Sequence, residues 1–433
     1  MLGAALFLLP LTACQKDDLL KPGDVESNVL VVGYVSDAEF AQNPIELDGE
    51  ALAREWGGAL DPERPILQVR VSREDGAGDP GDPLYVSIKA VYTQTHLYML
   101  FQWADDDPNV FKDALEYIGE DLRFGSGCYP PLATDASWRR LPEDEDRLSV
   151  VFEMEPSGDD LGSFAEQGCQ TACHVGSNPT FGGIDRGRLD VWQWLSTRTN
   201  PPRDLFERTE NPNFPLRGYP GYLEDYVIDA QVGLAPDPGS PSWRLNTAEG
   251  TRHPIFVYKV NDDIPFGSEG CRNEFQADCL KNNGLDEFYL FRDNVTNVYA
   301  EFSECDTLNE AVLPQGREPR RWKPAIPEIP GDIGDLVTGY WYTYARGSRA
   351  DVKGKGAWSD DEFRWTLEIG RRLDTGNPAD DVIFAGEPGE EIPFAIAIFD
   401  NSGAVHRGSV AQVLRFGPKT SSATARHDGE VPR

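Results

Sequence analysis

Apolar and polar residues alternate along several short segments of the chain, which is the pattern of half-buried β-strands. In two segments every second residue is apolar: Leu97, Met99, Phe101 and Trp103 in the first, and Leu148, Val150, Phe152 and Met154 in the second. Other apolar or β-branched runs predict strands at 29–35, 66–71, 84–90, 190–194, 255–260, 288–291, 298–302, 341–345, 363–369, 394–399 and 413–416. The segments 84–90 and 97–103 are expected to form a hairpin.

Helical periodicity is confined to a short piece near residues 50–56, so these strands are not separated by helices. Many short strands without intervening helices predict an all-β sandwich with long loops and insertions. We expect one domain over 29–417, with an acidic, cysteine-bearing insertion at about 261–315 and a polar tail at 418–433. The stretch from 195 to about 243 is polar and proline-rich, and no strand is predicted in it.

The acidic composition limits the kinds of molecule that the protein can bind. The chain has 433 residues and a net charge of −33, from 73 acidic and 40 basic side chains. This charge excludes nucleic acid as a partner, because the phosphate backbone would be repelled, and it could steer a basic redox protein to the surface. The acidic runs at 143–146 and 360–362 are expected to be solvated faces, and Arg198 is expected at the surface.

The first residues indicate the compartment. Leu2 to Ala13 is an apolar run that ends at Cys14 and resembles a bacterial lipobox. It predicts a signal peptide at 1–13, lipidation of Cys14 and a polar tether at 14–28. The predicted location is therefore the periplasm-facing side of a membrane, in the outer membrane of a Gram-negative bacterium. No other stretch approaches about 20 apolar residues, so the lipid is the only expected membrane contact.

The sequence Gly168 to His174 carries the predicted chemistry. Cys169, Cys173 and the directly following His174 resemble the Cys-x-x-Cys-His attachment site of c-type haem, with a spacer of three residues in place of two. The two thiols would form thioethers with haem c, and His174 would be the proximal ligand of the iron. The competing interpretation is a structural disulfide between Cys169 and Cys173, which would be strained at this spacing.

The remaining thiols fit an oxidising compartment. Four cysteines are left after lipidation and haem attachment: Cys128, Cys271, Cys279 and Cys305. They predict two disulfides, with three possible pairings that the sequence leaves open.

The sixth ligand of the iron is also left open by the sequence. Thioether and imidazole groups are the usual partners opposite a proximal histidine, and the candidates are Met154, His406 and Met99. Trp192 and Trp194 are candidates for packing on the porphyrin. The competing interpretation is core packing for the methionines and tryptophans and a hydrogen-bonded loop for His406, whereas His96, His253 and His427 are expected to be solvated. Since no triad, phosphate-binding loop or zinc motif is present, we expect an electron carrier and not an enzyme.

Several motifs, in order from about residue 30 to 415, carry a resemblance to a known family. They are Leu97–Asp105, Asp146–Phe152, Gly168–His174, Asp190–Trp194, Gly347–Val352, Trp365–Glu368, Arg372–Gly376, and Phe394–Asn401 with His406. The chain resembles the haem-binding domain of the cytochrome c-552/DMSO reductase-like group, which includes the haem subunit of ethylbenzene dehydrogenase. This resemblance implies an immunoglobulin-like β-sandwich with haem at one end.

The resemblance also implies a difference in ligation. Well-known members of that family hold a non-covalent haem between a methionine and a lysine, and the lysine follows directly after a Trp-x-Trp motif. This chain has Leu195 at that place, and leucine cannot bind iron. The expected protein is therefore a lipid-anchored, periplasmic electron-transfer protein with one covalent haem c.

Its expected partner is a redox protein, either a molybdenum oxidoreductase, of which the chain could be a subunit, or another cytochrome. Two alternatives stay open: a haem-based ligand sensor, and a haem-free lipoprotein that binds a ligand or carbohydrate.

Overall fold

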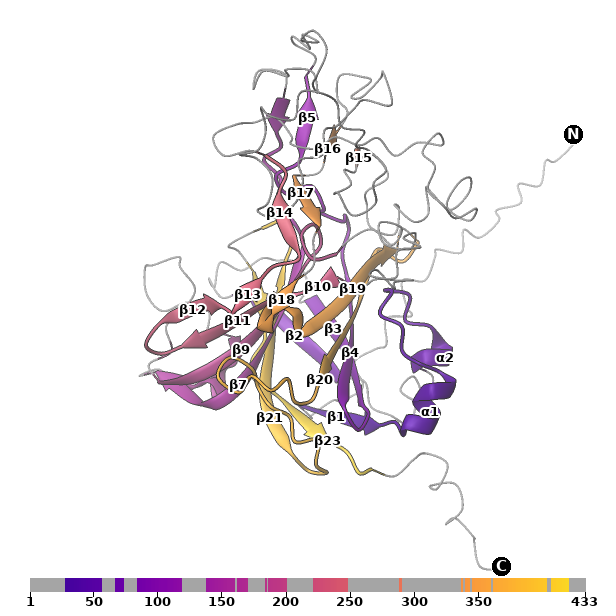
Figure 1. Cartoon of the computed structure of the whole chain (residues 1–433), viewed down its shortest axis with the longest axis vertical. Coiled ribbons are helices and arrows are strands. Elements are labelled where there is room, and N and C mark those ends of the chain that lie inside the picture. Colours follow the sequence, from indigo (N-terminus) through magenta and orange to yellow (C-terminus); the bar gives the residue numbers. More distant parts are fainter. Residues whose placement is uncertain are drawn as a thin grey trace, which may run out of the picture.

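Strands make up almost all of the regular structure in the computed structural model (Figure 1), which confirms the predicted all-β fold. The structure describes residues 28–56, 67–73, 84–118, 138–159, 162–169, 184, 186–200, 221–247, 288–289, 336–337, 339–342, 345–359, 361–402 and 406–419. Within these, the helices are short: α1 (Asp37–Gln42), α2 (Ala53–Trp56), α3 (Phe164–Gln167) and a 3-10 turn at Ser348–Ala350.

The strands form two layers. Layer 1 has the order β10 (Gly221–Tyr222), β19 (Val352–Ser359), β20 (Arg364–Arg372), β4 (His96–Ala104), β3 (Leu84–Tyr92) and β2 (Leu67–Arg73). Layer 2 has the order β23 (Gln412–Phe416), β21 (Glu391–Phe399), β7 (Arg147–Asp159), β9 (Arg186–Leu195), β11 (Glu224–Asp229) and β12 (Gly233–Pro236), with β8 (Gly162–Ser163) and β22 (Arg407–Gly408) at its margins. All neighbours in both lists are antiparallel.

Two strands connect the layers. β1 (Val29–Tyr34) runs parallel to β23 over its first four residues and then parallel to β3 over its last two. β2 pairs with β3 of layer 1 and, at its end, with β22 of layer 2. Strands that change layers in this way close one side of the sandwich.

The main core lies between the layers, as the alternation predicted. The inward residues of β4 (Leu97, Met99, Phe101, Trp103) and of β7 (Leu148, Val150, Phe152) are all buried. The rings of Trp194 and Trp365 pack edge to face at 4.9 Å between centroids, an arrangement that stabilises a core by about 0.5–1.5 kcal/mol beyond the buried area. Gly356 of β19 makes room for them, because a Cβ at this position would lie 2.8 Å from an indole carbon of Trp194.

Helix α1 arises from a local signal that the strand pattern did not include. Ser36 and Glu39 form a capping box, in which each side chain bonds the backbone of the other residue. The helix has no buried residue, but its Phe40 stacks on Tyr98 at 5.3 Å. A helix without a buried stripe leaves little trace in the hydrophobic pattern.

The polar, proline-rich stretch from 195 to about 243, in which no strand was predicted, holds several strands in its second part. This part contains β10, β11, β12 and two short strands, β13 (Gly239–Ser240) and β14 (Trp243–Leu245, running just past the expected end). β11 begins with the two buried acidic residues Glu224 and Asp225, so its sequence resembles a polar loop. β19 was also missed, since its sequence Val-Lys-Gly-Lys-Gly alternates lysine with glycine in place of apolar residues.

Three small sheets complete the structure. β5 (Leu115–Tyr117), β6 (Trp138–Arg140), β15 (Phe288–Tyr289) and β16 (Leu336–Val337) form one, and Figure 1 shows it at the end of the molecule away from β1 and β23. β14 pairs with β17 (Tyr340–Tyr342), and β13 with β18 (Arg346–Gly347).

Several predicted segments fall largely or wholly outside the described residues: the strands at 255–260 and 298–302, the signal peptide 1–13 and tether 14–28, the insertion 261–315 and the tail 418–433.

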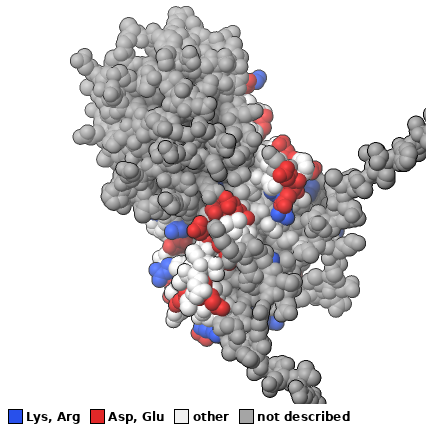
Figure 2. Space-filling view, turned by 90° about the vertical axis from the view of Figure 1, so that its right-hand side faces the viewer, with Lys and Arg blue, Asp and Glu red and all other residues white. Residues whose placement is uncertain are grey.

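The acidic composition is visible at the surface. On the face shown in Figure 2, Asp and Glu side chains of the described residues gather in several groups, with Lys and Arg side chains among them. Among the helices of the described part of the chain, none is long and apolar enough to cross a membrane.

Candidate functional site

Cys169 is held at a defined place by the end of helix α3. Gly168 is the C-cap of this helix, with a φ of +64°, and its N–H donates to the carbonyl of Phe164. The N–H of Cys169 donates to the carbonyl of Ser409 at 3.1 Å. These bonds place the cysteine, which is fully buried, against the segment that connects β22 to β23.

His406 lies beside this cysteine. Its Nε2 is 3.9 Å from Sγ of Cys169, and its ring packs on Phe399 at 4.8 Å. Both side chains are buried on the face of layer 2 that points away from layer 1. They border an apolar cluster there: Val151, Phe164, Cys169, Ile184, Leu189, Val191, Ile228, Ala395, Ala397 and Phe399. Of the sixth-ligand candidates, His406 is thus the one that the fold brings to Cys169.

The other candidates lie in or against the core between the layers, on the opposite side of layer 2 from Cys169. Met99, Trp192 and Trp194 are buried in the core between the layers, and Met154 is partly buried against the same core. Because side chains alternate along β7 and β9, the backbone of these strands separates this core from Cys169. Met99, Met154, Trp192 and Trp194 therefore contact the inter-layer core, which is the structural role that the sequence left open for them.

The rest of the predicted attachment site is not part of the described structure. Cys173, His174, Cys14 and the four cysteines expected in disulfides lie outside the described residues, as do His253 and His427. His96, at the start of β4, is partly buried and bonds the hydroxyl of Thr95.

The close approach at Gly168 leads to a testable expectation. A Cβ at residue 168 would lie 2.7 Å from the carbonyl oxygen of Ser409, in addition to the strain of a positive φ. We expect Gly168→Ala to lower the free energy of unfolding by about 3 kcal/mol, measured by urea denaturation. Gly376→Ala is the matched control, since φ is +84° there with open space around it, and about 1 kcal/mol is expected. Equal losses in the two variants would contradict the close approach.

The position after Trp-x-Trp is filled by a tight turn. Leu195 is fully buried, its N–H donates to Oγ1 of Thr199, and the N–H of Thr199 donates back to the carbonyl of Leu195. Leu195 therefore serves as the first residue of a hydrogen-bonded turn.

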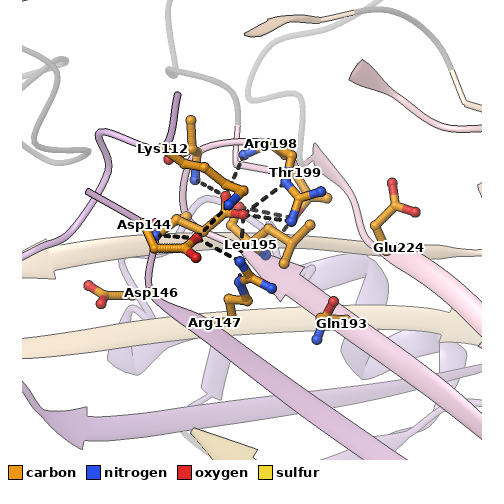
Figure 3. Close-up of polar contacts among 12 residues, drawn as sticks. Lys112, Asp144, Asp146, Arg147, Gln193, Leu195, Arg198, Thr199 and Glu224 are labelled. Atoms are coloured by element: carbon orange, nitrogen blue, oxygen red, sulfur yellow. Dashed lines mark hydrogen bonds and ion pairs between the residues drawn. The ribbon is translucent and has the colours of Figure 1, made fainter. Parts of the chain in front are cut away.

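A buried network of charges surrounds that turn (Figure 3). Glu145 is fully buried and accepts from Nε of Arg198 at 2.8 Å and from the N–H groups of Thr197 and Arg198. Asp144 pairs with Arg147 at 2.6 Å and with Lys112 at 2.7 Å. Burial acts to raise the pKa of Asp144, but the two cations together hold that pKa below its usual range.

Two expectations are therefore wrong here. Arg198 is not a surface residue, because it pairs with Glu145 and its guanidinium lies 5.0 Å over the ring of Trp243. The run 143–146 is not a solvated face, since Glu145 and Asp146 are both buried. The charged groups of this network are paired with one another or, for Arg198, also packed on the ring of Trp243. The network therefore stabilises the end of β9.

Two further acidic groups stand out. Glu368 lies close to Asp48 and Glu55. It accepts hydrogen bonds from Nε1 of Trp56 at 2.5 Å and from the N–H groups of Asp48 and Gly49, so it anchors the 48–56 segment to β20. The second group contains Asp190, Asp225 and Asp381, all buried.

The second group was not predicted from the sequence. Burial raises the pKa of Asp190 to about 7 and, with the neighbouring Asp190, the pKa of Asp225 well above its usual value. The available signal was the aspartate at the start of the predicted strand 190–194, whereas the segment around residue 225 resembled a polar loop.

The two layers define an all-β sandwich with a cysteine and a histidine together on one outer face. Comparison with known families gives the identification: a family model described as ethylbenzene dehydrogenase matches residues 70–212 and 285–411. The chain belongs to this family, which agrees with the resemblance seen in the sequence.

Other comparisons are more distant. A search of curated proteins gives no match. A Bacteroides uniformis structure assigned to carbohydrate binding is 8% identical, with a TM-score of 0.32, and the match covers 90% of this chain and 98% of that one. A family 9 carbohydrate-binding module from Caldicellulosiruptor kristjanssonii, in complex with glucose, is 7% identical with a TM-score of 0.29, covering 91% and 97%. Scores this low carry no conclusion about function.

Proposed function

We propose that this protein is a c-type cytochrome that transfers single electrons. Cys169 and Cys173 form the thioethers to one haem, and His174 is the proximal ligand of its iron. The bound haem iron supplies the one-electron redox chemistry. Membership of the ethylbenzene dehydrogenase family supports a role in haem binding.

The observation that carries it is the place of Cys169. Its sulfur lies in an apolar cluster, and a histidine nitrogen is 3.9 Å away. An apolar wall suits a macrocycle that must be shielded from water, and an imidazole is a common iron ligand. We assign His406 as the sixth ligand, because Met99 and Met154 contact the core between the layers.

The charge and the predicted lipid anchor complete the proposal. A lipoprotein on the periplasmic side of the outer membrane would meet its redox partner by diffusion along or near the membrane. A net charge of −33 would attract a basic partner and speed the encounter. The partner is a redox protein such as another cytochrome or a molybdenum oxidoreductase.

The test is a haem stain on a denaturing gel and a pyridine haemochrome spectrum, using full-length protein from a host that matures c-type cytochromes. Haem is expected to stay on the denatured wild-type chain and to be lost completely from Cys169→Ala plus Cys173→Ala. His406→Ala is expected to keep the covalent haem but to change the spectrum from low spin to high spin. His96→Ala is the matched control and is expected to leave the spectrum unchanged.

Each other outcome has a defined meaning. If haem is released on denaturation, the protein binds haem non-covalently, and the proposed thioether attachment is wrong. A wild-type spectrum that is already high spin, and that changes with carbon monoxide, would favour the haem-based sensor and remove His406 as a ligand. Matured protein without haem would refute the proposal and leave the haem-free, ligand-binding lipoprotein.

A further inference from the structure

Three buried aspartates from separate segments meet inside the sandwich. One carboxylate oxygen from each of Asp190, Asp225 and Asp381 lies within 4.8 Å of the others. Asp190 is on β9 and Asp225 on the neighbouring β11, where it is the register partner of Trp192. Asp381 belongs to the connection from β20 of layer 1 to β21 of layer 2, so the group joins the two layers.

Most oxygens of this group have no hydrogen-bond donor. Both carboxylate oxygens of Asp225 are buried without a partner, and Asp225 is 0% exposed. The nearby Asp237, 2% exposed, has the same deficit at both oxygens. Buried carboxylates elsewhere in the described structure, such as Glu145 and Glu368, accept several hydrogen bonds. A buried carboxylate without donors is strongly disfavoured.

Asp190 and Asp381 each accept hydrogen bonds at one carboxylate oxygen and none at the other. Oδ2 of Asp190 accepts from Arg371 at 3.1 Å and from the N–H of Val382 at 2.9 Å, whereas Oδ1 accepts no hydrogen bond. Oδ2 of Asp381 accepts from Oγ1 of Thr375 at 2.6 Å, and its Oδ1 also has no hydrogen bond. These donors orient the carboxylates of Asp190 and Asp381. Oδ1 of Asp190 is left without a donor, and Oδ1 of Asp381 lies 3.4 Å from NH2 of Arg371 without a hydrogen bond.

The charges do not balance. Arg371, fully buried, is the cation that pairs with Asp190 and Asp381. Arg349 is already paired with Glu224. When Asp190, Asp225, Asp237 and Asp381 are all ionised, a single guanidinium leaves three negative charges without compensation in the described structure. Excess negative charge in a buried place, with oxygens that lack donors, is the chemistry of a divalent cation site.

We propose that Asp190, Asp225 and Asp381 bind a calcium ion, with Asp237 as the acidic group behind Asp225. The ligand atoms are all oxygens, which disfavours zinc and copper, because these metals prefer nitrogen and sulfur ligands. Calcium accepts flexible oxygen coordination, whereas magnesium retains several waters, for which a fully buried site is poorly suited. The ion connects β9 and β11 to the segment after β20, and it lies on the face of layer 2 opposite Cys169, so it is independent of the proposed haem.

The test uses the full-length protein after treatment with EGTA, then titrated with calcium chloride. We expect one calcium ion per chain by calorimetry and a rise in Tm of about 5 °C or more at saturating calcium. Asp225→Asn is expected to weaken calcium binding at least about tenfold and to remove the Tm rise. In EGTA the same variant is expected to be at least as stable as wild type, because it removes an uncompensated buried charge.

Asp229→Asn is the matched control. It makes the same change on the same strand, where Oδ1 of Asp229 accepts from the N–H of Gln231, and it is expected to leave calcium binding unchanged. The proposal is overturned if wild type shows neither calcium heat nor a Tm rise, which would mean that the carboxyls share protons instead. It is also overturned if Asp225→Asn responds to calcium like wild type, because the ion would then bind elsewhere.

Discussion

Arg371→Met is expected to lower the free energy of unfolding by about 3–5 kcal/mol, because it removes the cation that pairs with the buried Asp190 and Asp381. Arg371 is fully buried, and its NH1 donates to Asp190 at 3.1 Å. Its NH2 donates to the carbonyl of Val382 at 2.7 Å, and the guanidinium lies 5.1 Å over the ring of Trp192. Methionine fills much of the same volume but leaves Asp190 and Asp381 without their cation and the carbonyl of Val382 without this donor.

The measurement is urea denaturation in EGTA, so that calcium cannot replace the lost charge. Arg372→Met is the matched control, since Arg372 is the next residue of β20 and its side chain is exposed; a change of at most about 0.5 kcal/mol is expected. A loss below about 1 kcal/mol for Arg371→Met would show that the aspartates are protonated and need no cation.

Glu145→Gln is expected to cost about 3 kcal/mol of the free energy of unfolding, since it removes the charge that pairs with Arg198 and, together with Asp144, with Arg147. Arg198 lies 2.7 Å from Glu145 and Arg147 lies 3.6 Å from it, and their side chains are 13% and 8% exposed. Glutamine keeps the shape of the side chain and one acceptor oxygen. The loss of stability therefore measures the effect of removing the charge and not that of a cavity. The carboxylate also acts to raise the pKa of Arg198 against the effect of burial.

The control for this prediction is a surface ion pair. Glu155 pairs with Arg188 at 2.5 Å, but its side chain is 52% exposed, so Glu155→Gln is expected to change stability by less than about 1 kcal/mol. Urea denaturation of both variants in the same buffer gives the comparison. Equal, small losses would mean that Arg198 keeps its place through Trp243 alone, and the turn at the end of β9 would then not depend on Glu145.

The sequence predicted most of the sandwich because its strands carry their own signal. The alternation in β4 and β7 needs only a pleated strand and one buried face, and both strands are buried as expected. β11 and β19 were missed because their buried positions hold aspartate, glutamate, glycine and lysine. A polar strand is stable only where another segment supplies its partners, and a local pattern does not contain those partners.

The same distinction holds for the two sites. The sequence by itself determined the class of fold, the family resemblance and the Cys169–His174 motif, since each of these depends on residues that are neighbours along the chain. Only the tertiary structure decided that His406 lies beside Cys169 while Met99 and Met154 contact the core between the layers, because strand pleating sets the face and pairing sets the neighbour. It also brought Asp190, Asp225 and Asp381 together across about 190 residues, since the burial and electrostatics of such a group depend on distances in space.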